Sequence, residues 1–380
     1  MRFALVGARI FDGETLRDNC AVVIENSRII AVAPRGDLGA DVARRDVQGL
    51  LAPGFIDVQV NGGGGVLLND VRTAAGLRQI AEAHRRFGVT GLMPTFITDA
   101  RDKMAEVIGA ARDAIQAQAP GVLGLHLEGP FINPARKGAH NPRFMRPIED
   151  EDIRLMTSLG VGRTIVTLAP EMVPMRAIAT LAQAGVLICA GHTAASYEVI
   201  AEARRHGLRG YTHLFNAMPP LTGREPGPVG AALDETESWC GLIVDFHHVS
   251  APMLRVALKA RGPEKMMLVS DAMSSVGSDL TSFNLQGRIV HRANGKLTLD
   301  DGTLAGSDLD MASAVRNTVS ELGVSLEDAL RMASLAPAAF LKLDHELGRI
   351  APGYRADLVL LDEKLQARDT WIGGRASGEV

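Results

Sequence analysis

The sequence has few aromatic residues, few cysteines and no excess of positive charge. Phe, Trp and Tyr make up 4% of its 380 residues, and only 3 residues are cysteine. Three cysteines form no recognisable pairing framework, which argues against a small secreted scaffold held together by disulfide bonds. The 40 Lys and Arg residues against 44 Asp and Glu residues give a formal net charge of -4. A general nucleic-acid binder normally carries a basic surface, so no nucleic-acid partner is expected.

Long hydrophobic runs are also missing. No apolar stretch approaches the roughly 20 residues of a membrane-spanning helix. The apolar stretch near the N-terminus is interrupted by Arg9 and Asp12 and is too short for the core of a signal peptide. We therefore expect a cytoplasmic protein without a membrane partner.

From Gly54 onward, short apolar runs alternate with longer amphipathic segments. Strands that alternate with helices predict a parallel sheet, because each connection must cross a face of the sheet. Eight such strands in succession predict an α/β fold in the form of a (β/α)8 barrel rather than an open sheet. The candidate strands are Phe55–Asn61, Gly91–Thr98, Val122–Glu128, Arg163–Ala169, Val186–Gly191, Gly210–Phe215, Cys240–Phe246 and Met266–Asp271.

Both ends of the chain contain short β-type stretches separated by turn residues. We expect the two ends to pair into one small β-sandwich domain beside the barrel. The expected division is residues 1–52 and 345–380 for the small domain and residues 53–344 for the metal-dependent catalytic barrel. The β-type stretches are Phe3–Val6, Cys20–Glu25, Arg28–Ala33, Arg349–Leu361 and Thr370–Arg375.

Four candidate strands end in side chains that could bind a metal or transfer a proton. The C-terminal ends of the strands surround the active site of a parallel barrel, so these side chains should converge. Two imidazoles and one carboxylate leave a fourth position for water, as in a catalytic zinc site. A further aspartate could then take the proton of that water and pass it to the leaving group. The four residues are Glu128, His192, His213 and Asp271.

Several stretches carry a recognisable family pattern. They include HLEGPFINPARKGAHN (residues 126–141), AGHT (190–193), HLFNAMPPLTGREPGPVG (213–230) and VSDA (269–272), together with residues 53–70 and 302–316. These stretches closely resemble the N-acetylglucosamine-6-phosphate deacetylases of the amidohydrolase superfamily, and residues 347–362 resemble the closing β segment of the superfamily. The resemblance covers nearly the whole chain. It implies a hydrolase that removes the acetyl group of N-acetylglucosamine 6-phosphate.

The resemblance also implies a catalytic centre. Glu128, His192 and His213 would hold one divalent metal ion per subunit, with zinc favoured and iron or cobalt as alternatives. Asp271 would be the general base and acid. His140, in the KGAHN context, would polarise the amide carbonyl and stabilise the oxyanion.

A phosphate grip is implied for two further residues, His248 and Arg224. The resemblance places Arg224 at the site of a partner subunit, which implies a homodimer. A guanidinium fork suits phosphate, although Arg224 on its own would be interpreted as a solvated loop residue. His247 stands next to His248 and leaves that choice open. The other implied substrate contacts are Ala139, Asn216, Ala217, Leu304, Ala305 and Gly306.

One departure concerns the first barrel strand. Many amidohydrolases carry His-x-His there and bind a second metal, whereas this sequence has Gln59 and Asn61. Neutral amides are weak ligands for transition metals, so we expect a single metal ion. Gly63, where some relatives have Cys, removes a further ligand and favours the same expectation.

Three alternatives stay open at this point. The substrate could be another acetamido-sugar phosphate such as N-acetylgalactosamine 6-phosphate. The two sugars differ only in the orientation of one hydroxyl, and no residue of the sequence identifies which orientation is bound. A cyclic-amide hydrolase usually has the strand-one histidines and a bridging lysine, and no lysine ends the fourth strand at residues 167–169. A non-catalytic relative that binds ligands would normally have lost metal ligands, which this chain retains.

Overall fold

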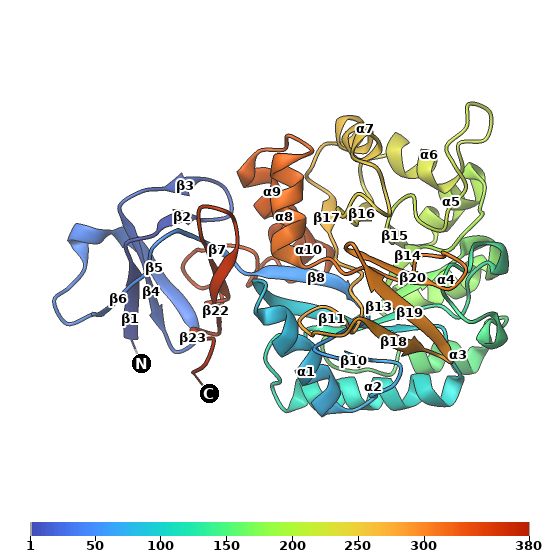
Figure 1. Ribbon diagram of the computed structural model, residues 1–380, viewed down its shortest axis with the longest axis horizontal. Coiled ribbons are helices and arrows are strands. Elements are labelled where there is room, and N and C mark those ends of the chain that lie inside the picture. Colours follow the sequence, from blue (N-terminus) through green and yellow to red (C-terminus); the bar gives the residue numbers. More distant parts are fainter. Residues whose placement is uncertain (1, 380) are drawn as a thin grey trace.

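The computed structural model describes residues 2–379, and the larger part of it is a parallel barrel with helices around it (Figure 1). The barrel strands follow the order β17-β16-β15-β14-β13-β12-β11-β8. A parallel bridge between Val60 and Ala272 links the two outer strands. The predicted (β/α)8 fold is confirmed. The barrel strands are β8 (Phe55–Val60), β11 (Val89–Ile97), β12 (Gly124–Glu128), β13 (Arg163–Leu168), β14 (Leu187–Ala190), β15 (Leu208–Tyr211), β16 (Trp239–Leu242) and β17 (Met266–Leu268).

Helices cover the outside of the barrel and explain why its strands are almost continuously apolar, since both faces of each strand are buried. All nine residues of β11 are buried, for example. Side-chain caps mark several helix starts: Thr73 accepts from Gly76 N and Ser196 accepts from Val199 N. The helices are α1 (Ala74–Arg85), α2 (Arg101–Gln116), α3 (Asp150–Met156), α4 (Met175–Gln183), α5 (Tyr197–Arg205), α6 (Gly227–Asp234), α7 (Ala251–Arg261), α8 (Met311–Ser320), α9 (Leu326–Ala333) and α10 (Leu335–Phe340).

Three barrel strands end three or four residues earlier than predicted, because the chain turns sharply after them. β15, β16 and β17 end at Tyr211, Leu242 and Leu268. Residues with positive φ follow each of these strands: His213 (31°), Phe246 (62°) and Asp271 (54°). A left-handed residue cannot continue a strand, so the polar side chains stand on turns at the barrel opening.

The two ends of the chain pair in a small β-structure beside the barrel. β7 (Leu50–Pro53) runs antiparallel to β21 (Leu358–Leu361), with Leu51 opposite Leu360. Figure 1 shows the first and last segments side by side at one end of the molecule. Residues 349–357, predicted as strand, instead form turns and an isolated bridge. The two sheets have the orders β5-β4-β1-β6 and β23-β22-β21-β7-β2-β3.

The other strands of these two sheets are short. They are β1 (Arg2–Val6), β2 (Arg9–Phe11), β3 (Leu16–Arg17), β4 (Cys20–Glu25), β5 (Arg28–Pro34), β6 (Ala43–Asp46), β22 (Ala367–Ile372) and β23 (Arg375–Ala376). Residues from both ends share one apolar core, in which Leu5, Ile24 and Leu51 lie with Leu358 and Trp371. The predicted pairing of the two ends is confirmed.

A three-stranded antiparallel sheet between β17 and α8 was not predicted. It consists of β18 (Ser282–Leu285), β19 (Arg288–Ala293) and β20 (Lys296–Leu299) and lies in front of the barrel in Figure 1. Leu285 and Leu297 of this sheet share an apolar cluster with Met273 and Ala305. Its short strands alternate buried and exposed residues, so they lack the apolar runs that marked the barrel strands. This sheet helps to enclose the opening of the barrel.

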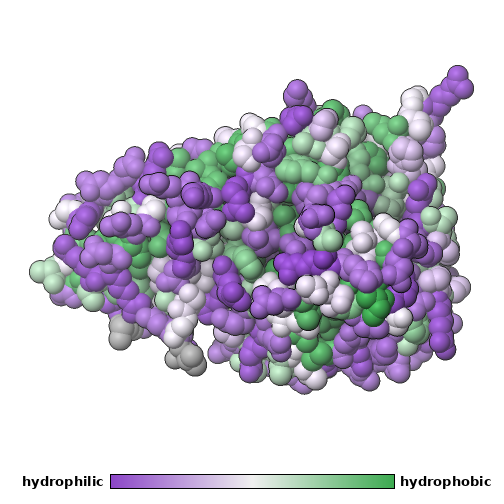
Figure 2. Space-filling view, viewed as in Figure 1, coloured by the Kyte–Doolittle hydropathy of each residue, from purple (hydrophilic) through white to green (hydrophobic). Residues whose placement is uncertain are grey.

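Most of the surface in Figure 2 is hydrophilic, with hydrophobic side chains in scattered patches over the barrel. Within residues 2–379, every helix is too short or too polar to cross a membrane.

Candidate metal and substrate site

The carboxylate of Glu128 meets two imidazoles at the C-terminal end of the barrel. His192 Nε2 lies 3.1 Å and His213 Nε2 lies 3.0 Å from Glu128 Oε1, and the two Nε2 atoms are 3.1 Å apart. Glu128 is the last residue of β12, whereas His192 and His213 each stand two residues beyond a strand. All three side chains are buried, at 2%, 5% and 3% exposure. The convergence expected from the strand ends is present.

These three groups fit a cation. His192 Nδ1 lies 2.8 Å from the carbonyl oxygen of Arg136, which can only accept, so Nδ1 carries a proton. Nε2 is then the ring nitrogen of His192 that faces Glu128 Oε1. Burial raises the pKa of Glu128, but the hydrogen bonds and charges of His192 and His213 outweigh burial and hold it well below its ordinary value. A carboxylate facing imidazole nitrogens within hydrogen-bond distance is the donor set of a divalent metal ion.

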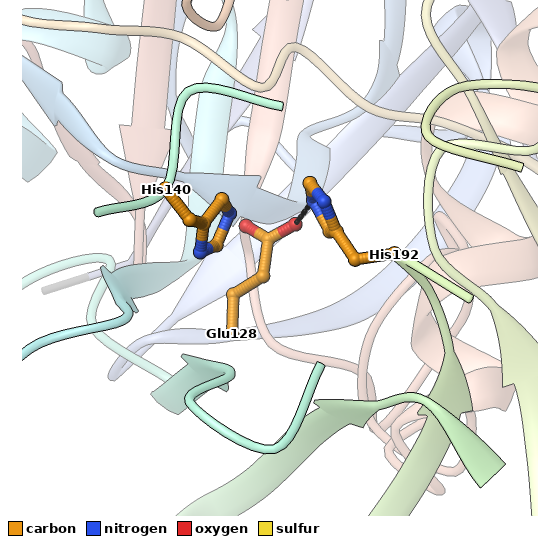
Figure 3. Close-up of side chains that lie close together, drawn as sticks. All are labelled: Glu128, His140 and His192. Carbon is orange, nitrogen blue, oxygen red and sulfur yellow. Dashed lines mark hydrogen bonds and ion pairs between the residues drawn. The ribbon is translucent and has the colours of Figure 1, made fainter. Parts of the chain in front are cut away.

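His140 lies on the opposite side of Glu128 from His192 (Figure 3). Potential ligand atoms of Glu128, His140 and His192 all lie within 4.8 Å of one another. His140 Nδ1 is 2.8 Å from Thr98 Oγ1, and its ring centroid is 4.3 Å from that of His192. Burial, followed by the proximity of His192, lowers the pKa of His140 well below its ordinary value, so the ring is neutral. The nitrogen of His213 is also close to this group, because its Nε2 lies against the same Glu128 oxygen as His192 Nε2.

Asp271 is held beside this group by two amide side chains, one in β8 and one directly after it. Asn61 Nδ2 donates to Asp271 Oδ1 at 2.7 Å and Gln59 Nε2 donates to the same oxygen at 3.1 Å. Gln59 Nε2 also lies 3.3 Å from both oxygens of Glu128. Burial and the charge of Glu128 raise the pKa of Asp271 to about 6. Gln59 and Asn61 therefore act as donors to carboxylates, and Asn61 Oδ1 is buried without a partner.

The backbone around these residues is strained. His192, His213 and Asp271 have φ values of 50°, 31° and 54°, a region that residues other than glycine rarely adopt. The surroundings enforce this conformation: Asp271 N donates to Gln59 O and Ser307 N donates to Asp271 O, both at 2.9 Å. Strain that is imposed at several positions of one cluster is typical of functional sites.

A cavity of about 360 Å³ opens onto this cluster. Every predicted substrate contact of this chain except Arg224 lies on it. Arg224 is exposed in the loop before α6, which projects from the barrel in Figure 1. The predicted residues on the cavity are Glu128, Ala139, His140, His192, His213, Asn216, Ala217, His248, Asp271, Leu304, Ala305 and Gly306.

Some residues on the cavity were not predicted as contacts. Met273 and Leu285 supply apolar surface, and Leu285 belongs to the sheet that the sequence did not reveal. Arg136 precedes the KGAHN motif, and that neighbourhood was the one signal that could have identified it.

The structure distinguishes the two adjacent histidines. His248 lies on the cavity, and its Nδ1 is 2.7 Å from Asp245 Oδ2. His247 is not among the residues that line this cavity within the described chain. Burial raises the pKa of Asp245, but the hydrogen bonds and charge of His248 together with the backbone N–H of His247 outweigh burial and lower it. Because Asp245 occupies Nδ1, Nε2 is the ring nitrogen of His248 that remains available to a ligand.

His126 lies in the barrel interior rather than on the cavity. Its Nδ1 is 3.0 Å from Val58 O and its Nε2 is 2.8 Å from Thr167 Oγ1. Burial lowers the pKa of His126 to about 4, which keeps the ring neutral. His126 is therefore a packed, hydrogen-bonded residue of the barrel interior.

Comparisons with known proteins agree with this geometry. The amidohydrolase family matches residues 50–379, and the NagA composite domain matches residues 2–51. The chain is 41% identical to an N-acetylgalactosamine-6-phosphate deacetylase of Shewanella sp. (strain ANA-3), over 97% of this chain and 94% of that protein.

Two solved structures are similar over 99% of both chains. One is N-acetylglucosamine-6-phosphate deacetylase from Pasteurella multocida, with a TM-score of 0.96 and 33% identity. The other is a mutant of N-acetyl-D-glucosamine-6-phosphate deacetylase from Mycobacterium smegmatis in complex with N-acetyl-D-glucosamine-6-phosphate, with a TM-score of 0.91 and 30% identity.

Proposed function

The chain belongs to the amidohydrolase family, and we propose that it removes the acetyl group of N-acetylglucosamine 6-phosphate. The products are glucosamine 6-phosphate and acetate, so the enzyme hydrolyses a carbon–nitrogen bond that is not a peptide bond. The observation that carries this proposal is the convergence of Glu128, His192 and His213 with Asp271 on one cavity. At about 360 Å³ the cavity has the size of a small-molecule site.

Glu128, His192 and His213 would hold one divalent metal ion per subunit. Zinc is our first choice, and iron or cobalt also suit two imidazoles and a carboxylate. The bound ion would supply a Lewis acid for the amide carbonyl and lower the pKa of a water molecule. A single ion is supported by Gln59 and Asn61, whose amide nitrogens already donate to carboxylates.

Asp271 would move the proton. Its carboxylate is held towards the cavity by Asn61 and Gln59, and a pKa of about 6 leaves it ionised at neutral pH. As general base it takes a proton from the attacking water, and as general acid it returns that proton to the leaving amine. His140, neutral and bonded to Thr98 through Nδ1, would donate from Nε2 to the oxygen on which negative charge develops.

The sugar phosphate would lie along the rest of the cavity. His248, with Asp245 on its Nδ1, would present its Nε2 to the phosphate. Arg224 would reach the phosphate of a neighbouring subunit in a homodimer, which is supported by its exposure on a projecting loop. The contacts proposed for the sugar are Ala139, Asn216, Ala217, Leu304, Ala305 and Gly306.

N-Acetylgalactosamine 6-phosphate is the second candidate substrate. The Shewanella relative named for that substrate is 41% identical, against 33% for the Pasteurella structure named for the glucosamine epimer. The two sugars differ in the orientation of one hydroxyl, so the same metal and proton-transfer groups would serve both.

The test uses the purified, zinc-loaded protein with each sugar phosphate in turn. Release of acetate and of a primary amine in equal amounts is expected, with a higher kcat/KM for N-acetylglucosamine 6-phosphate. A higher value for the galactose epimer would establish the second candidate. No acetate from either sugar would contradict the proposal and favour a non-catalytic binding protein.

We also propose that the enzyme acts in the cytoplasm and is divided into a small domain of residues 1–52 and 345–380 and a barrel of residues 53–344. The cytoplasm is supported by Cys20, Cys189 and Cys240, which are free thiols. The division is supported by the separate apolar core that residues of both ends share.

A further inference from the structure

Arg136 lies on the wall of the substrate cavity, on the segment that follows β12. Its carbonyl oxygen accepts the proton of His192 Nδ1 at 2.8 Å, and its N–H donates to Asn133 O at 2.8 Å. Asn133 N in turn donates to His192 O at 2.9 Å. The backbone of Arg136 is therefore fixed directly beside a proposed metal ligand.

The guanidinium of Arg136 has no partner within residues 2–379. Its Nε is buried without a hydrogen bond, and no other hydrogen bond or ion pair of this side chain is formed in that part of the chain. Other arginines near the site are engaged: Arg288 donates to the carbonyl oxygen of Ala139, and Arg292 pairs with Asp308 at 2.8 Å. A buried donor without an acceptor is unfavourable, and a ligand that brings an oxygen removes that cost.

Arg136 also differs in charge from the other residues of the cavity wall. Glu128 and Asp271 are the carboxylates on its wall, and the imidazole of His248 is paired with Asp245. Among the described residues that line the cavity, Arg136 is the only lysine or arginine. The proposed metal ion would be taken up by Glu128, His192 and His213, so the unpaired guanidinium is the remaining cation that favours the entry of a phosphate group.

The geometry points to Arg136 as a phosphate-binding residue of this site, whose guanidinium donates to the phosphate oxygens of the bound sugar phosphate. This inference rests on the proposed function, because that function supplies the phosphate. The planar guanidinium matches phosphate oxygens and stays charged at every working pH. Unlike Arg224, Arg136 would bind the phosphate of the substrate in its own subunit.

The experiment compares four metal-loaded proteins: the wild type, Arg136→Gln, Arg136→Lys and the control Lys137→Gln. Lys137 is the next residue, is exposed and is not among the residues that line the cavity. Each protein is assayed with N-acetylglucosamine 6-phosphate and with N-acetylglucosamine, and the ratio of the two kcat/KM values is taken. Metal content is measured in parallel and should not change, because the hydrogen bond between Arg136 and His192 is made by the backbone of Arg136.

For Arg136→Gln we expect the ratio to fall about 10- to 100-fold, mainly through KM of the phosphorylated sugar, as for loss of a charge-assisted hydrogen bond. The ratio for Arg136→Lys should lie between those of the wild type and Arg136→Gln. Lys137→Gln should keep the wild-type ratio. An unchanged ratio for Arg136→Gln, or equal losses on both sugars, would overturn the inference and assign Arg136 to the sugar ring or to the loop alone.

A second measurement separates this inference from the proposed function. If the wild type hydrolyses neither sugar, the proposed function fails, and the binding of glucosamine 6-phosphate and glucosamine is compared by calorimetry instead. Weaker binding of only the phosphorylated ligand to Arg136→Gln supports the phosphate contact. Equal binding of that ligand to both proteins refutes it.

Discussion

Replacing Asn61 with Leu tests how the chain sets the proton affinity of Asp271. The two side chains are nearly equal in size, and Asn61 Oδ1 has no partner to lose. The change removes one strong interaction, the 2.7 Å hydrogen bond from Asn61 Nδ2 to Asp271 Oδ1. That bond favours the ionised carboxylate, so its loss raises the pKa of Asp271 above the value of about 6 that burial and Glu128 already impose.

The expected magnitude follows from the strength of that bond. A hydrogen bond to a charged group contributes about 1.5–3 kcal/mol, and a tenfold change in proton affinity corresponds to about 1.4 kcal/mol. Removing it should therefore raise the pKa of Asp271 by about 1 to 2. Because Gln59 still donates to the same oxygen at 3.1 Å, we expect the rise in pKa to lie at the lower end of this range.

The assay is the pH dependence of kcat/KM, whose acid limb reports the base of the free enzyme. Asp271 must be ionised to accept a proton, so a higher pKa moves the acid limb to higher pH. Activity of Asn61→Leu should fall more at pH 6 than at pH 8. Both proteins carry the same metal, so the difference between their acid limbs reports the loss of Asn61.

Asn69→Leu is the matched control. Asn69 is equally buried, at 4% exposure, but its amide donates to Ile97 O and Asp99 Oδ2 rather than to Asp271. This variant should lose stability and keep the wild-type acid limb. The reasoning is refuted if Asn61→Leu folds, retains its metal and shows an unshifted acid limb.

Three further outcomes are expected. Asp271→Asn should lower kcat about 10²- to 10⁴-fold. It should bind the substrate nearly as well in calorimetry, since its Oδ1 still accepts from the neighbouring amides, and near-normal turnover would exclude the role of Asp271 as base. Treatment with a chelator should abolish activity and added zinc should restore it, whereas His192→Ala should stay inactive and lose metal on dialysis; a fully active chelated enzyme would contradict the metal site. Gly63→Cys should still bind one metal ion, and two tightly held ions per chain would contradict the single-ion site. Its free energy of unfolding, measured with denaturant, should fall by about 1–3 kcal/mol, because the new Cβ would lie 2.8 Å from His84 Nε2.

Local patterns in the sequence were sufficient to predict the barrel and the side chains that meet at its opening. Alternation of apolar runs and amphipathic segments is a local pattern, and it identified all eight barrel strands. The rule that strand ends surround the active site then selected Glu128, His192, His213 and Asp271 without any knowledge of contacts. Position along the chain was sufficient here, because the closure of a parallel barrel brings every strand end to one opening.

Features that depend on residues far apart in the chain are visible only in the folded structure. The three-stranded sheet β18–β19–β20 covers the opening through side chains whose strands have no distinctive apolar run. The bond between Asn61 and Asp271 joins residues separated by 210 positions. The unpaired guanidinium of Arg136 is a property of its surroundings, since the same side chain would find a carboxylate or water at most surface positions. Local patterns decide which residues stand at strand ends, whereas the partners of each side chain depend on the packing of the whole chain.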